Sequence, residues 1–175
     1  MRTDNLREFF PERYPRRLDM AKGIPDIFEL VKDAVHEREG VVRAGLMLGL
    51  AELGGSADHV LCGLHPLGTN IILMNKAALR RVESTRPELV KPFIFHVLMH
   101  EYLHTVGLTG EGETRLKVLE ISRPLFGNDH PVTQMAEDIS RFLPSIAYPT
   151  RMPLPEGTEI ELVEGFDRSS ATYFA

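Results

Sequence analysis

The chain has 175 residues, of which 43% are hydrophobic and 26% are charged, and its formal net charge at pH 7 is −5. This composition is ordinary for a globular protein, and the length suits one domain with a sizeable core. The negative charge and an isoelectric point near 5.8 give the chain no electrostatic footprint for nucleic acid, so we expect no nucleic-acid partner.

Cysteine content and hydropathy narrow the class of protein further. The single cysteine, Cys62, excludes an internal disulfide framework. No stretch approaches the roughly 20 apolar residues that are needed to cross a bilayer. Residues 1–10 carry charges where a secretory signal would need an apolar run. We therefore expect a cytoplasmic protein with no membrane partner.

The N-terminal part of the chain predicts an arm followed by a helix. Residues 1–23 contain Pro11, Pro15 and many charges, which indicates an irregular or partly helical arm. From Pro25 onwards the apolar residues recur at helical spacing until Gly40. Proline suits a first helical turn and glycine suits a helix end, so we predict a helix between them.

Three apolar runs punctuated by glycines come next, at 41–53, 60–67 and 69–75. We interpret them as short strands joined by turns. A helix is the competing interpretation of residues 41–53. Its two internal glycines would each cost about 1 kcal/mol relative to alanine, which favours the strand.

The next predicted helix covers residues 87–106. Pro87 suits its first turn, and Ser84 or Thr85 is a suitable cap. Gly107 is a suitable helix end.

Two further helices are predicted at 113–126 and 131–142, each after a short turn. The C-terminal tail, 144–175, is rich in proline and then alternates between polar and apolar residues at 158–163, which predicts one more strand. These elements predict an α+β fold in a single domain over residues 1–175. In it a small twisted sheet packs against the central helix and its neighbours.

A His-Glu-x-x-His motif lies inside the predicted helix 87–106, at His100, Glu101 and His104. Histidines four residues apart share one face of a helix, so both imidazoles can reach one Zn²⁺ at roughly 2.0–2.1 Å. The carboxylate of Glu101 points to the neighbouring flank, where it can take a proton from a metal-bound water. The surrounding residues are uncharged, which favours a buried helix with one polar stripe. These uncharged neighbours are Val97, Leu98, Met99, Tyr102, Leu103 and Val106.

The alternative is a buried helix whose two histidines are merely hydrogen-bonded. That arrangement would leave the carboxylate of Glu101 hard to satisfy without a metal.

A catalytic zinc usually takes three protein ligands and one water, so a third ligand is needed. We favour His130, because a residue before Pro131 is held extended at a helix entrance, where its side chain can point back across the fold. The sequence does not decide the choice. Four glutamates are the other candidates: Glu111, Glu113, Glu120 and Glu137.

Two other histidines lie near the motif. His96 is one turn before His100, and three collinear histidines converge poorly on one ion, so we expect a core or supporting position for it. His65 could face the cleft from a predicted strand, although a packed or exposed position is the simpler expectation.

With its uncharged neighbours, the motif at 100–104 resembles the zincin metallopeptidases. The resemblance implies zinc as cofactor, His100 and His104 as ligands, Glu101 as general base, and a peptide or protein substrate. In the metzincin subgroup a third histidine stands where this chain has Gly110, so the chain departs from that pattern, although Glu111 next door has a longer reach.

Two other subgroups offer a third ligand of a different kind. Gluzincins take a glutamate from the following helix, as Glu113 or Glu120 would supply. The SprT-like peptidases take a histidine from a loop that opens a helix, and His130 is similar to it.

The resemblance also implies a role for residues 68–75. In zincins a strand at the edge of the sheet beside the metal commonly aligns an extended substrate through main-chain hydrogen bonds. Residues 68–75 resemble that strand by position alone, and an ordinary core strand is the alternative.

Together these features predict a zinc-dependent metallopeptidase in which Glu101 accepts a proton from the zinc-bound water and delivers it to the leaving amine. One alternative is a catalytically silent zinc-binding domain with a regulatory or interaction role and a zincin fold. Glu101 argues against it, because a purely structural site has no need for a base and favours four protein ligands. A hydrolase of non-peptide amides is a third possibility.

Overall fold

The computed structural model describes residues 12–56, 59–143, 146–147 and 154–168. Two short 3₁₀ helices, Pro87–Leu89 and Ile139–Arg141, accompany the α-helices. The α-helices are α1 (Arg13–Met20), α2 (Ile24–Glu39), α3 (Lys76–Thr85), α4 (Val90–Thr105), α5 (Glu111–Phe126) and α6 (Pro131–Asp138).

The strands form two small sheets. The strands are β1 (Met47–Ala51), β2 (Gly55–Ser56), β3 (His59–Leu61), β4 (Gly63–Leu64), β5 (Ile71–Asn75), β6 (Ile146–Ala147) and β7 (Ile160–Leu162). Four of them form a mixed sheet in the order β4-β5-β1-β7, in which β1 and β5 are parallel and the other pairs antiparallel. The others form a sheet in the order β2-β3-β6. The α+β class is thus confirmed.

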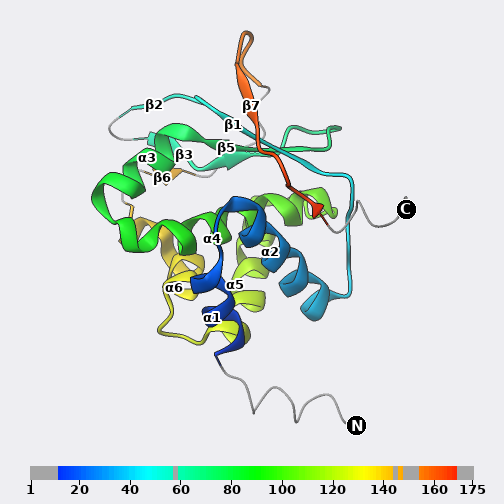
Figure 1. Ribbon diagram of the computed structural model, residues 1–175, viewed down its shortest axis with the longest axis vertical. Coiled ribbons are helices and arrows are strands. Elements are labelled where there is room, and N and C mark those ends of the chain that lie inside the picture. The colour runs from blue at the N-terminus through cyan, green and yellow to red at the C-terminus, as the bar shows by residue number, and fades with distance from the viewer. Residues whose placement is uncertain (1–11, 57–58, 144–145, 148–153, 169–175) are drawn as a thin grey trace.

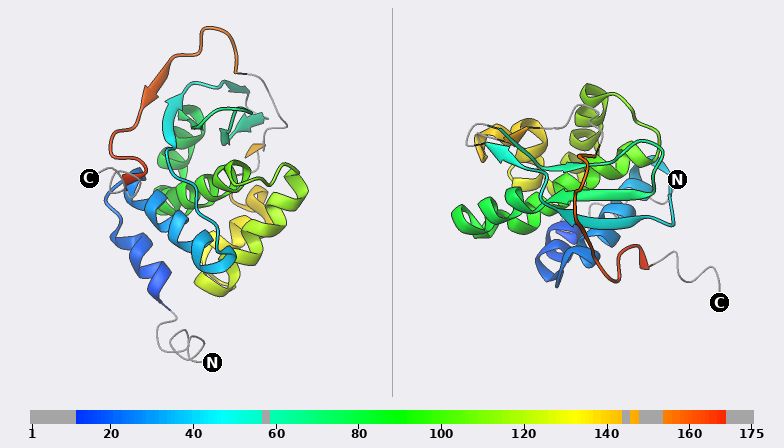
Figure 2. Two further views of the ribbon diagram at one scale, coloured as in Figure 1. Left: turned by 90° about the vertical axis from the view of Figure 1, so that its right-hand side faces the viewer. Right: turned by 90° about the horizontal axis from the view of Figure 1, so that it is seen from above.

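Helix α4 lies in the centre of the molecule, between the four-stranded sheet on one side and helices α1, α2, α5 and α6 on the other (Figure 1). Figure 2 shows the same layering from two further sides. Nearly every side chain of α4 is buried, as expected for a helix that is apolar around its whole circumference. The polar residues of the predicted motif therefore lie inside the core. Among the described residues, no helix combines the length and apolar character that crossing a bilayer requires.

Most of the predicted elements are confirmed. The helix between Pro25 and Gly40 is α2, and Gly40 ends it in the left-handed conformation at φ 71°. The strand interpretation of residues 41–53 is correct for the part that forms β1. The later predicted helices correspond to α4, α5 and α6, and the tail strand to β7.

The N-terminal arm is helical and packed from residue 13 onwards, so its description as an irregular arm is wrong for that part. Tyr14 and Leu18, one turn apart on α1, are both buried, and the Tyr14 ring lies 5.9 Å from that of Phe126. Pro15 is compatible with this helix because it stands in the first turn, where its missing N–H has no partner to lose. Residues 1–11 lie outside the described residues.

Helix α3 is absent from the sequence prediction. The side chain of Asn75 caps it by accepting a hydrogen bond from the Ala77 N–H at 3.1 Å. The predicted cap of the next helix is also wrong, because Ser84 and Thr85 belong to the end of α3, where their hydroxyls donate to the carbonyl of Arg81.

The expectation that residues 68–75 form a sheet edge is corrected. Strand β5 lies between β4 and β1, so it is an interior strand, and β4 is the edge. Strand β4 occupies the edge because residues 63–64 fold back and pair antiparallel with β5.

The described part of the C-terminal tail packs on α2. Asp167 forms a buried ion pair with Lys32 and accepts a hydrogen bond from the Leu46 N–H at 2.9 Å. The ring of Phe166 stacks on Phe28 with centroids 3.9 Å apart. These contacts hold residues 166 and 167 against α2, which itself packs on α4.

Candidate metal centre

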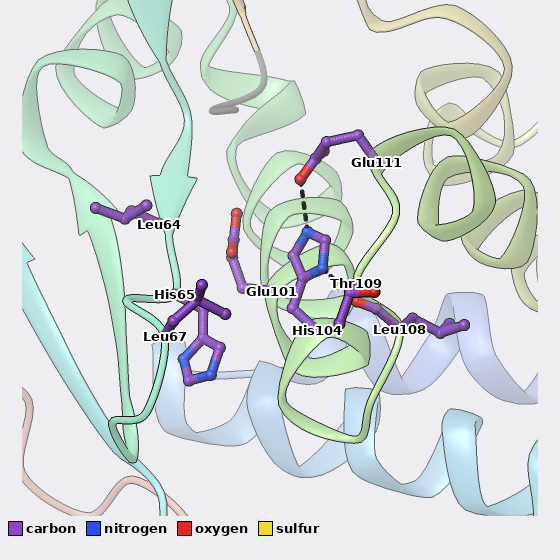
Figure 3. A pocket seen from close by; sticks show the side chains of 8 residues that line it. All are labelled: Leu64, His65, Leu67, Glu101, His104, Leu108, Thr109 and Glu111. Atoms are coloured by element: carbon purple, nitrogen blue, oxygen red, sulfur yellow. Dashed lines mark hydrogen bonds and ion pairs between the residues drawn. The ribbon is translucent and has the colours of Figure 1, made fainter. Parts of the chain in front are cut away.

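Three donor side chains converge where α4 ends and α5 begins. His100 and His104 project from one face of α4, and their Nε2 atoms are 3.2 Å apart. Glu111, the first residue of α5, places Oε2 3.0 Å from His100 Nε2 and Oε1 2.9 Å from His104 Nε2. Figure 3 shows the Glu111 carboxylate reaching toward the His104 ring.

The turn between the two helices brings Glu111 to this position. Gly107 adopts φ +114°, a conformation that favours glycine, and so ends α4. The Leu108 N–H then bonds to the Leu103 carbonyl at 3.1 Å, which folds the turn back against the helix. Glu111 consequently starts α5 directly above the two histidines, and the N-terminal end of a helix is favourable for a negative charge.

These separations fit a divalent ion. A tetrahedral ion with bonds of roughly 2.0–2.1 Å would hold its ligands roughly 3.3 Å apart. The three separations observed here are 2.9, 3.0 and 3.2 Å. Within the described part of the chain, His100, His104 and Glu111 are the His, Cys, Asp or Glu side chains whose donor atoms lie close enough together to hold one metal ion. Two imidazoles and a carboxylate are also the donor set of many catalytic zinc sites.

A backbone carbonyl orients His104. Its Nδ1 lies 2.6 Å from the carbonyl oxygen of Leu108. A carbonyl can only accept, so Nδ1 carries a proton, and the neutral tautomer with this proton has its lone pair on Nε2. Nε2 faces His100 and Glu111, which is the direction that a metal ligand requires.

The charge states of the cluster also suit a cation. Burial lowers the pKa of His100, whose side chain is 1% exposed, although Glu111 opposes the change. Burial alone would raise the pKa of Glu111, but its hydrogen bond with His100 and the nearby histidines outweigh burial and lower it. A neutral imidazole and an ionised carboxylate are the forms that bind metals.

Glu101 lies beside this cluster and not within it. Its side chain is 1% exposed, and its carboxylate lies between Leu64 and His65 on one side and His104 and Glu111 on the other (Figure 3). Burial and the charge of Glu111 raise the pKa of Glu101 to about 8, while a hydrogen bond from the backbone N–H of His65 works in the opposite direction. A bound cation would favour the ionised form.

Edge strand β4 approaches α4 closely at Gly63. A Cβ at this position would lie 3.0 Å from Cγ1 of Val97 and 3.5 Å from Cγ of Glu101, both on α4. The same Cβ would lie 2.8 Å from the Leu73 carbonyl of β5, so any larger residue would displace β4. The glycine therefore allows the His65 backbone to reach the carboxylate of Glu101.

A small cavity opens beside Glu101 and His104. Its volume is about 40 Å³, which holds a few water molecules but no large side chain. One wall comes from the β4 side and the other from the α4–α5 turn, as Figure 3 shows. The lining residues are Leu64, His65, Leu67, Glu101, His104, Leu108, Thr109 and Glu111.

His130, the favoured third ligand, does not join the cluster. It caps α6, where its Nδ1 accepts a hydrogen bond from the Val132 N–H at 3.2 Å, and its ring packs 4.8 Å from that of Phe126. The extended backbone expected before Pro131 is present, with ψ 139°. The capping bond, however, directs the ring to its own helix.

Among the other candidates, Glu111 is the residue that the structure brings to the histidines. Glu120 pairs with Lys117 on its own helix, and Glu137 pairs with Arg123. Gly110, directly before Glu111, indicated a helix that starts at Glu111, but we predicted the start at residue 113.

The sequence did not predict two further features of the site, the Leu108 carbonyl and the His65 N–H. Both are backbone groups, so no side-chain pattern reveals them. His65 lines the cavity, although a packed or exposed position was the simpler expectation for it. His96 is a buried core residue, as we expected. Comparison of the chain with models of known families, with curated proteins and with solved structures found no match.

Proposed function

We propose that the chain is a zinc-dependent metallopeptidase of the zincin type, with His100, His104 and Glu111 as the metal ligands. The observation that carries the proposal is the convergence of these three donors, 2.9–3.2 Å apart, beside a buried carboxylate that is not one of them. A site built only for stability would not need that fourth residue. Zinc fits the two imidazoles and one carboxylate, and such a ligand set leaves one position for water.

When bound, zinc would polarise a carbonyl group and make a coordinated water more acidic. Glu101 is the chain's own base for such a water. Its burial raises its proton affinity, so it can take a proton from the water and pass it to the leaving amine. The His65 N–H holds one side of the carboxylate and so fixes its direction.

The substrate that suits this site is an extended peptide. Strand β4 pairs with β5 on one side and, in the described sheet, with no strand on the other. A peptide can add to that free edge through main-chain hydrogen bonds. The cavity is too small to enclose a substrate, so the peptide would lie across its mouth, with the scissile carbonyl between Glu101 and the three ligands.

The test is hydrolysis of casein or a peptide library by the zinc-loaded protein. We expect activity that a chelator abolishes and added Zn²⁺ restores. Glu101→Gln should retain zinc but lose about 10²–10⁴-fold in kcat, whereas Glu113→Gln, which changes an exposed carboxylate on α5, should behave as the parent. Cleavage by Glu101→Gln at the parent rate would refute the proposed base. Stoichiometric zinc without turnover would instead support a silent zinc-binding domain.

A further inference from the structure

Arg43 connects two segments that lie on opposite sides of the cavity. It stands in the link between α2 and β1, and its backbone N–H donates to the Tyr102 hydroxyl at 2.9 Å. Its guanidinium donates through Nη1 to the Thr105 carbonyl at 2.5 Å and through Nη2 to the Thr69 carbonyl at 3.4 Å. One arginine thus joins the end of α4 to the loop between β4 and β5.

The contacts with α4 anchor Arg43 to a rigid part of the protein. Thr105 is the last residue of the helix, so its carbonyl has no partner further along α4, and a positive charge is favourable at this end of a helix. Tyr102 lies inside the metal-binding motif, is fully buried, and packs edge-on against Phe28 at 5.6 Å.

The contact with Thr69 holds the opposite wall. The loop at 66–70 carries Leu67, which lines the cavity and is 66% exposed at its mouth. Thr69 stiffens this loop by donating both its N–H and its hydroxyl to the Pro66 carbonyl. At the start of the loop, His65 Nδ1 bonds to the Ile71 carbonyl at 2.8 Å. A displacement at Thr69 is therefore passed to the residues that line the cavity.

We propose that Arg43 is a positioning residue that sets the width of the substrate cleft by holding the β4–β5 loop against the end of α4. This inference rests on the proposed function, since it concerns a peptide lying along β4. The hydrogen bonds of Arg43 go to Thr69, Tyr102 and Thr105, none of which is a proposed metal ligand. A guanidinium fork reaches two carbonyls at once, whereas the point charge of a lysine serves one.

The test compares Arg43→Ala and Arg43→Lys with Arg38→Ala, which removes an exposed arginine near the end of α2. For Arg43→Ala we expect kcat/KM to fall roughly 10- to 100-fold, chiefly through KM. Zinc affinity, measured by competition with a chelator, should stay at the parent value. Arg43→Lys should recover part of the loss, and Arg38→Ala should match the parent. An unchanged KM in Arg43→Ala, or a loss of activity that follows a loss of zinc, would overturn the inference.

A second measurement is independent of turnover. Amide hydrogen exchange at residues 65–71 should be faster in Arg43→Ala than in the parent, with α2 unchanged. If the parent protein cleaves no peptide, the proposed function fails. Faster exchange in Arg43→Ala would still support the inference that Arg43 holds the β4–β5 loop against α4. Equal exchange in the two proteins refutes that inference, whatever the activity.

Discussion

The backbone N–H of His65 donates a hydrogen bond to the carboxylate of Glu101. This bond joins the edge strand to the central helix at the residue that we propose as the base. It depends on the glycine two positions earlier, where a Cβ would lie 2.8 Å from the Leu73 carbonyl of β5 and 3.0 Å from Val97 Cγ1 of α4. The orientation of the base is therefore set by an element that lies 36 residues away in the sequence, at His65.

Gly63→Ala should disturb the base more than the metal. The added Cβ would lie 2.8 Å from the Leu73 carbonyl and 3.0 Å from Val97 Cγ1, so β4 must shift. We expect about 1–3 kcal/mol of destabilisation in urea unfolding, and a fall in kcat with zinc binding retained.

The control for that variant is Gly23→Ala, which should lower stability slightly, because Gly23 is the N-cap of α2 and alanine is a poorer cap, but should leave kcat and zinc binding unchanged. Gly23 has extended backbone at φ −173°, and its added Cβ would lie at an ordinary 3.8 Å from Pro25. Parent-like stability and kcat in Gly63→Ala would show that the close approach of β4 has no catalytic consequence.

Glu111 and His130 can be distinguished by metal affinity. Glu111→Ala removes a proposed direct ligand and should weaken zinc binding at least about 100-fold, the upper end of what the loss of a supporting residue costs. His130→Ala removes a helix cap and should lower stability by about 0.5–2 kcal/mol with little effect on zinc. Chelator competition and urea unfolding measure the two effects. The reverse pattern would restore His130 as the third ligand.

Gly107→Ala should act on the metal through the backbone. At φ +114° a side chain strains the turn, so the Leu108 carbonyl should move away from His104 Nδ1. Loss of such a supporting hydrogen bond typically costs 10- to 100-fold in metal affinity. The matched control is Gly112→Ala on α5, where a Cβ meets nothing within 4 Å and should add about 0.5–1 kcal/mol of stability. Zinc affinity that is equal in the two variants would contradict the role of Leu108.

Acid should destabilise the metal-free protein partly through His96. Burial, the largest cause, lowers the pKa of His96 to about 3, against about 6.5 for an unfolded chain. Between these values the unfolded state binds a proton that the folded state does not, so stability falls as the pH drops below 6.5. The limiting slope is about 1.4 kcal/mol per pH unit.

His96→Gln should flatten that dependence when both proteins are unfolded with urea in excess chelator from pH 6.5 to 4.5. At pH 7.5 and above this histidine makes no contribution to the slope. Identical pH slopes in the two proteins would show that His96 is not protonated on unfolding in this range.

Local patterns were sufficient for the central helix and for two of the three proposed ligands. A spacing of four residues places His100 and His104 on one face of any α-helix, and an apolar surround buries that helix in any compact fold. The same local logic was too coarse for α1 and α3. In both, a few apolar residues at helical spacing were hidden among charged ones.

The sequence by itself therefore determined the paired histidines, the neighbouring carboxylate and the α+β class, because each depends on spacing along one element or on the order of elements. Tertiary structure alone decided that Glu111 and not His130 faces the pair, and that β4 and not β5 forms the edge. Those outcomes depend on where a turn sends the chain and on which strand folds back beside its neighbour. Several glutamates and strands satisfy the local rules equally, and only packing across the core selects among them.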